Sequence, residues 1–211
     1  MPRTSFRAAA AEIVRRDPVM ADLSRRAGPF RLPKPTVDHF QALAESILYQ
    51  QLAGAAAAAI HRRFVALFDD GVSPEGVLAL SIERLRSAGL SGAKATSILD
   101  LAGKVVDGTV PLEDIERLSD DEIVERLSLV RGIGPWTAEM FLIFQLRRLD
   151  VWPVDDYGVR QGYALAYGMP ALPKPKELMG LGERFRPYRT VTAWYCWQAV
   201  HLSRSRPKGR A

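Results

Sequence analysis

Hydrophobic positions recur every three or four residues along most of this chain, which is the spacing of amphipathic helices. Residues 37–47 follow this spacing directly after Thr36, a residue that can cap a helix. Residues 55–68 form an alanine-rich stretch of high helix propensity, and Gly54 separates it from the helix before it. The alternation of apolar and polar residues that marks a strand is nearly absent. The pattern therefore predicts a mainly or wholly α-helical fold.

Serine caps and glycine or proline stops divide the rest of the chain into further helices. Serines that stand where a helix can begin are Ser73, Ser81, Ser91 and Ser119. Glu122 gives Ser119 the spacing of a capping box, which predicts a helix from Asp120 to about Leu129. Later helices are expected from Pro135, from Asp155 or Asp156 to Gly168, over residues 176–185 and over residues 191–202.

The segment Leu129–Gly134, LVRGIG, joins two of these helices through two glycines that are separated by one residue. Glycine suits such a turn because it adopts positive φ and lets a phosphate approach the bare backbone. The N–H groups and the dipole at the start of the following helix also favour an anion. Ile133 is expected to insert into the core and fix the hairpin. An ordinary corner between two helices is the alternative interpretation.

The helix from Pro135 has apolar residues around most of its circumference, which predicts burial on nearly all sides. Two adjacent carboxylates, Asp155 and Asp156, follow it at the start of another predicted helix, where either could serve as the N-cap. A carboxylate just beyond a phosphate-binding hairpin also indicates chemistry at a sugar. These residues therefore point to an enzyme as well as to a binding protein.

LVRGIGPWTAEMF followed by DVWPVDDYGVRQ resembles the helix–hairpin–helix (HhH-GPD) DNA glycosylases, and among them the DNA-3-methyladenine glycosylase II (AlkA-type) branch. ESILYQQLAGAAAAAI at residues 45–60 and LSGAKATSILDLA at residues 90–102 resemble further segments of that branch. The resemblance spans residues 36–203. It implies the compact form of the family, without the N-terminal β domain that some members carry.

The fold implied by the resemblance is all-α, with two lobes and an active-site cleft between them that holds Asp156. One lobe would be residues 36–143, a helical bundle that includes the hairpin. The other would be built from both ends of the chain, residues 1–35 and 144–211.

The same resemblance implies a base excision repair enzyme that flips an alkylated purine, such as 3-methyladenine or 7-methylguanine, out of duplex DNA and hydrolyses its N-glycosidic bond. The family pattern makes the second carboxylate, Asp156, the catalytic residue and leaves Asp155 structural. A carboxylate at this place stabilises an oxocarbenium-like sugar and helps to position or activate water. Members that also cut the strand have a lysine where this chain has Trp136, so the reaction should stop at an abasic site.

Two other functions stay open at this point. A non-catalytic helix–hairpin–helix DNA-binding protein would keep the hairpin and lose the acid, yet Asp156 is present. A lyase-competent or mismatch-type glycosylase would need a lysine near Trp136 or an iron–sulfur cluster. The single cysteine, Cys196, excludes a four-cysteine cluster.

The resemblance also assigns binding residues. A flipped cationic base needs an aromatic or soft stacking surface, and the residues expected to line its pocket are Trp136, Met140, Tyr188 and Trp194, with weaker support for Trp197. The residues expected to bind DNA are Gln51, Gly132, Ile133, Gly134, Thr137 and Arg189. Gln51 is expected to be the wedge that fills the gap in the duplex, or else a cap of the preceding helix. A structural Na⁺ or K⁺ could lie on the backbone carbonyls of Ser128, Val130 and Ile133; no cofactor is required.

The charge distribution agrees with a polyanion as partner. Residues 1–36 have a net charge of +5, residues 174–211 of +7, and the middle of the chain of −7. A lone cysteine fits a reducing cytosol. The sequence contains no run of 18 apolar residues, so no membrane span is predicted. We therefore expect a cytoplasmic monomer, associated with the nucleoid if the source is prokaryotic, that binds double-stranded DNA containing alkylated bases.

Overall fold

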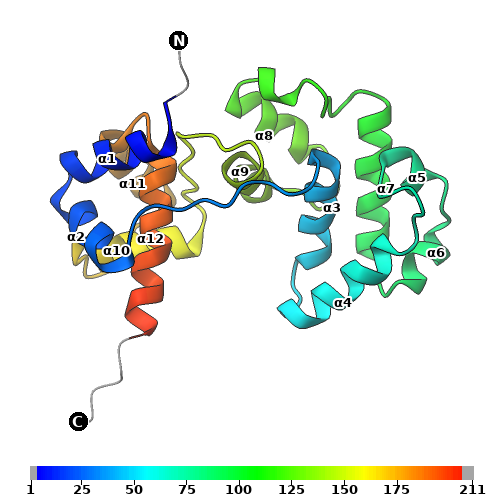
Figure 1. Cartoon of the computed structure of the whole chain (residues 1–211), viewed down its shortest axis with the longest axis horizontal. Helices are drawn as coiled ribbons and strands as arrows, with labels where there is room; N and C mark the ends of the chain where they lie inside the picture. Colours follow the sequence, from blue (N-terminus) through cyan, green and yellow to red (C-terminus); the bar gives the residue numbers. More distant parts are fainter. Residues whose placement is uncertain (1–3, 206–211) are drawn as a thin grey trace, which may run out of the picture. The chain divides into compact units, whose positions relative to one another are not determined.

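The computed structural model describes residues 4–205 (Figure 1). All regular structure in these residues is helical, which confirms the all-α prediction for this part of the chain. The chain divides into two compact units, which are described one at a time: unit 1 is Met1–Pro33 with Arg147–Ala211, and unit 2 is Lys34–Leu146. The end of the basic C-terminal segment, residues 206–211, lies outside the described residues.

Unit 2 is built around its longest helix, α7. Its elements are α3 (His39–Tyr49), α4 (Gly54–Val65), α5 (Pro74–Leu78), α6 (Ile82–Ser87), α7 (Gly92–Val106), the 3-10 helix η1 (Ile115–Arg117), α8 (Asp120–Ser128) and α9 (Pro135–Phe144). Helix α7 contacts α3, α5 and α6, while α8 and α9 pack on each other. The largest fully buried side chains of this core include Leu43, Ile47, Phe64, Ile98 and Leu101.

Serine caps determine where four helices of unit 2 begin, as predicted. The hydroxyl groups of Ser73, Ser81, Ser91 and Ser119 each accept the backbone N–H three residues further on. Ser119 and Glu122 form the complete capping box, in which the Ser119 N–H donates to the Glu122 carboxylate at 2.8 Å. These starts are readable from sequence because each cap depends on residues within one turn of it.

Unit 1 combines both ends of the chain. Its elements are α1 (Phe6–Arg16), α2 (Pro18–Ala27), α10 (Tyr157–Tyr167), α11 (Pro175–Gly182), the 3-10 helix η2 (Glu183–Phe185) and α12 (Arg189–Arg204). Helix α12, drawn orange to red in Figure 1, contacts α1, α2 and α10. The shared core joins apolar residues from both ends, among them Ile13, Met20, Tyr163, Phe185 and Tyr195.

The structure corrects several of the expected helices. Helices α1 and α2 were not expected, although Ser5 and Asp17 cap them. Helix α3 begins at His39 rather than at residue 37, because Asp38 and not Thr36 accepts the N–H of its first turn. Helix α9 is not buried on nearly all sides, since Trp136 and Phe144 are 46% and 41% exposed. None of the helices in residues 4–205 is long and apolar enough to cross a membrane.

Candidate functional site

The two glycines of the predicted hairpin lie between α8 and α9 and differ in conformation. Gly132 has a φ of +82°, in the region that favours glycine, whereas Gly134 has the extended values φ −102° and ψ 176°. A Cβ added at Gly132 would lie 2.9 Å from the Ser97 Oγ, and one added at Gly134 would meet no atom within 4 Å. Only Gly132 is therefore needed for the turn itself, while Gly134 leaves the backbone uncovered at the start of α9.

Side chains from two other segments of unit 2 hold the hairpin. The Gln50 amide donates to the Gly132 carbonyl at 2.9 Å. On α7, Asp100 accepts the Arg131 N–H at 2.7 Å and pairs with Lys104 at 2.5 Å. Partial burial raises the pKa of Asp100, but the Arg131 N–H and the Lys104 ammonium outweigh it, so this pKa lies below its ordinary value. The hairpin is thus fixed to the rest of unit 2 by a charged hydrogen-bond network.

Ile133 is inserted into the core as expected, with 3% of its surface exposed. Its N–H donates at 3.0 Å to the Val130 carbonyl, one of the oxygens expected to hold a monovalent cation. No group of three or more His, Cys, Asp or Glu residues within 4–205 is arranged to hold a metal ion. Thr137, which is expected to bind DNA, is buried, with 5% of its surface exposed. The predicted cation site therefore consists of main-chain oxygens alone.

Asp156 is the N-cap of α10 in unit 1. Its Oδ1 accepts the Val159 N–H at 2.7 Å and the indole Nε1–H of Trp197, on α12, at 2.9 Å. The expectation that Asp155 would take the structural role is corrected: Asp155 is exposed, and the capping side chain belongs to Asp156 because α10 begins at Tyr157.

Trp197 reaches Asp156 because α10 and α12 approach closely at Gly158. A Cβ on Gly158 would lie 2.8 Å from the Trp197 Cδ1 and 3.1 Å from the Asp156 Oδ1. Sequence reasoning gives Trp197 only a weak place in the base pocket and does not connect it with Asp156. The signal for this contact is the pair Gly158 and Gly162, which lie four residues apart on one face of α10 and mark a close helix crossing.

Most of the chain matches a known protein family. Residues 44–187 match the HhH-GPD superfamily of base excision DNA repair proteins. The chain belongs to this superfamily. It is similar to DNA-3-methyladenine glycosylase 1 of Schizosaccharomyces pombe, with 37% identity over 167 residues that cover 78% of this chain and 73% of the relative.

Solved structures of HhH-GPD glycosylases resemble the fold over nearly its whole length. A DNA-3-methyladenine glycosidase from Bacillus halodurans is 34% identical, with a TM-score of 0.85 over 93% of this chain and 91% of that one. The S. pombe 3-methyladenine DNA glycosylase Mag1, solved in complex with abasic DNA, is 34% identical, with a TM-score of 0.77 over 90% of this chain and 95% of that one.

The residues expected to line the base pocket of this HhH-GPD protein differ in exposure. Trp136, in the first turn of α9, is 46% exposed, and Met140, one turn later, is half-buried. In unit 1, Trp194 packs edge-on against Tyr195 with ring centroids 5.0 Å apart. Trp194 and Tyr188 both pack against the unit 1 core. The ring most open to a ligand is therefore that of Trp136.

Arg189, expected to bind DNA, is engaged by Asp150 in unit 1. Its guanidinium donates to Oδ1 at 2.8 Å and to Oδ2 at 3.0 Å, and its side chain is only 13% exposed. This bidentate pair fixes the start of α12 to the segment between α9 and α10. Arg186 pairs with the same carboxylate and Arg184 with Asp17, but their side chains are 49% and 51% exposed. Arg184 and Arg186 are the more accessible cations of this segment.

The loop between α3 and α4 carries Gln51, the expected wedge. Gln51 is exposed and has a φ of +57°, which is uncommon for a residue other than glycine. The C-cap of α3 is its neighbour Gln50, and Lys94 donates to the carbonyls of Leu48 and Gln50. The C-terminal end of α3 is therefore capped without the Gln51 side chain. Leu52, beside it, is 38% exposed, so the loop presents one amide and one apolar side chain.

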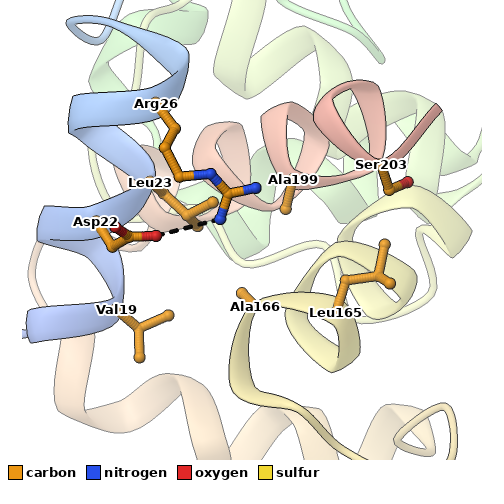
Figure 2. Close-up of a pocket in the computed structure, with 8 residues that line it drawn as sticks. All are labelled: Val19, Asp22, Leu23, Arg26, Leu165, Ala166, Ala199 and Ser203. Atoms are coloured by element: carbon orange, nitrogen blue, oxygen red, sulfur yellow. Dashed lines mark hydrogen bonds and ion pairs between the residues drawn. The ribbon is translucent and has the colours of Figure 1, made fainter. Parts of the chain in front are cut away.

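Two pockets lie within the units and away from the predicted site residues. In unit 1 a pocket of about 190 Å³ is lined by residues of α2, α10 and α12, with the Asp22–Arg26 ion pair at its wall (Figure 2). Leu165 lines it near the opposite end of α10 from Asp156. In unit 2 a hollow of about 620 Å³ has a partly acidic lining, from Asp38, Glu75, Glu113 and Asp114. Neither pocket is lined by a residue predicted for catalysis or base binding.

Proposed function

We propose that this chain is a monofunctional DNA glycosylase that hydrolyses the N-glycosidic bond of alkylated purines in duplex DNA. Its family repairs DNA by base excision, and several relatives are named DNA-3-methyladenine glycosylases. Mag1 was solved with abasic DNA, the product that base removal leaves. The observation that carries the proposal is the Asp156 carboxylate, which two donors hold by one oxygen at the start of α10.

The reaction breaks the bond between C1′ of the deoxyribose and the purine nitrogen and forms a bond between C1′ and a water oxygen. Positive charge develops on the sugar as the first bond lengthens, and the Asp156 carboxylate stabilises it while positioning the water. An alkylated purine carries its positive charge before the reaction and leaves as a neutral base. One carboxylate is therefore sufficient, because no general acid has to protonate the leaving base.

The hairpin is the part of unit 2 that binds the DNA backbone. Gly134 leaves its main chain in open space, and no side chain caps α9, so the start of this helix favours a phosphate. A Na⁺ or K⁺ on the main-chain oxygens of residues 128, 130 and 133 would strengthen this contact. Trp136, just after the hairpin, occupies the position where a lyase needs a lysine to form a Schiff base. The reaction therefore stops at the abasic site.

The test is release of free base from methylated duplex DNA. The purified protein is incubated with DNA treated with a methylating agent, and released 3-methyladenine and 7-methylguanine are separated by chromatography from those lost spontaneously. We expect release well above the rate without protein. Borohydride added during the reaction should trap no covalent protein–DNA complex, because only a Schiff base is reduced to a stable link.

The other candidate function is that of a non-catalytic hairpin protein that binds DNA. It would be supported by normal binding to duplex DNA without release of any methylated purine. Trapping by borohydride would instead show a lyase and contradict the monofunctional assignment.

The two hairpin glycines should respond differently to substitution by alanine. Gly132→Ala introduces a Cβ at positive φ and against Ser97, and should lower the free energy of unfolding by about 1–3 kcal/mol. Gly134→Ala meets open space in an extended conformation, so stability should change little. Its methyl group would instead stand between the backbone and a phosphate and weaken DNA binding roughly tenfold. Denaturant unfolding and fluorescence anisotropy with labelled duplex measure the two effects. Unchanged affinity of Gly134→Ala would remove Gly134 from the DNA contact.

A further inference from the structure

Helices α10 and α12 of unit 1 approach closely at two glycines of α10. A Cβ on Gly162 would lie 2.7 Å from the Cys196 Cα and closer still to its carbonyl group. One turn earlier, Gly158 faces the ring of Trp197. The crossing therefore places the indole beside the first turn of α10, where Asp156 lies.

Two hydrogen bonds to the Asp156 carboxylate fall on the same oxygen, Oδ1. The Val159 N–H at 2.7 Å is the ordinary N-cap bond, which ties Oδ1 to the helix. The indole Nε1–H at 2.9 Å arrives from another helix. A single donor leaves the carboxylate able to turn about this bond, whereas two donors from different directions fix its plane. The second oxygen, Oδ2, then keeps one direction relative to α10.

The residue before Trp197 on α12 is a cysteine. Cys196, next to Trp197, is fully buried, and burial raises the pKa of its thiol, with a further increase from the negative charge of Asp156. The thiol therefore stays neutral and is no second acid.

We propose that Trp197 is a positioning residue for Asp156: its indole N–H orients the carboxylate toward the sugar, and Gly158 is glycine so that the ring can approach. The proposal rests on the proposed glycosylase function. It differs from a stacking role for Trp197, because stacking on a flipped base needs the ring alone, whereas positioning needs the N–H.

Trp197→Phe separates these roles, since it keeps an aromatic ring and removes the N–H. We expect the single-turnover rate constant for release of 7-methylguanine to fall about 10- to 100-fold, the range expected for one hydrogen bond to a charged group. Affinity for abasic duplex should stay within about twofold, because the bond acts on the carboxylate and not on DNA binding. Gly158→Ala should lower the rate in the same way, because its methyl group displaces the ring.

The decisive measurement repeats Trp197→Phe in an Asp156→Asn background. If the indole acts through the carboxylate, it should matter less than about twofold once the charge is gone, a strong departure from additivity. Trp152→Phe is the matched control, since it removes another indole hydrogen bond of unit 1, at 2.8 Å to the Leu178 carbonyl. It should lower stability and leave the rate constant near that of the wild type.

The outcomes separate this inference from the proposed function. A Trp197→Phe variant as fast as the wild type, or an equal loss in both backgrounds, would overturn the positioning role while the glycosylase assignment stands. A wild-type protein that releases no methylated base would overturn the proposed function, and the inference with it.

Discussion

Asp156→Asn is expected to lower the single-turnover rate constant of base release by at least about 100-fold while the protein stays folded. The charge that stabilises the sugar is lost, but the side-chain oxygen that caps α10 remains. Asparagine caps a helix about as well as aspartate, so the free energy of unfolding should change by less than about 1 kcal/mol. It can also still accept the Val159 N–H and the Trp197 indole. The measurement is base release from methylated duplex under excess enzyme, beside denaturant unfolding of the same preparations.

Asp155→Asn is the control that the sequence itself supplies. Asp155 is the adjacent residue, is exposed and does not cap α10, so its variant removes the same charge from nearly the same place. We expect it to release base at a rate within about threefold of the wild type, because an exposed charge is strongly screened. Equal losses in the two variants would mean that general electrostatics, and not a positioned carboxylate, drives the reaction.

The hairpin and most helix starts were accessible from sequence because their causes are local. Ser91 and Ser119 cap helices through atoms within one turn, and Gly132 adopts the positive φ that its place in LVRGIG indicates. Which of Asp155 and Asp156 is the N-cap stayed open in the sequence, because it depends on the exact start of α10, and a shift of one residue exchanges the two roles. Helix α1 was not predicted, although Ser5 and the alanine-rich segment after it are local helix signals.

The remaining site features depend on contacts far apart in the chain. Nothing near Arg189 indicates that Asp150, 39 residues earlier, engages its guanidinium. The same holds for the hydrogen bond from Trp197 to Asp156, across 41 residues. Periodicity identifies which residues face a core but not which two helices will share it. The exception is a pair of glycines such as Gly158 and Gly162, because small residues on one face are needed where two helices nearly touch.

Gly162→Ala is therefore expected to have the largest effect on stability. The added methyl group would overlap the backbone of Cys196, and a backbone cannot rotate out of the way as a side chain can. Helices α10 and α12 would have to separate, which should lower the free energy of unfolding by about 3 kcal/mol or more. Thermal and denaturant unfolding followed by circular dichroism measure this loss.

Gly103→Ala distinguishes the steric effect from the general effect of alanine in a helix. Gly103 lies inside α7, and a Cβ there would meet no atom within 4 Å. That variant should be about 0.5–1 kcal/mol more stable than the wild type, because alanine has the higher helix propensity. If the Gly162→Ala variant were as stable as the Gly103→Ala variant, α10 and α12 could not be in the contact described. Where the variant still folds at low temperature, we expect base release to fall as well, because separating α12 from α10 withdraws the Trp197 indole from Asp156.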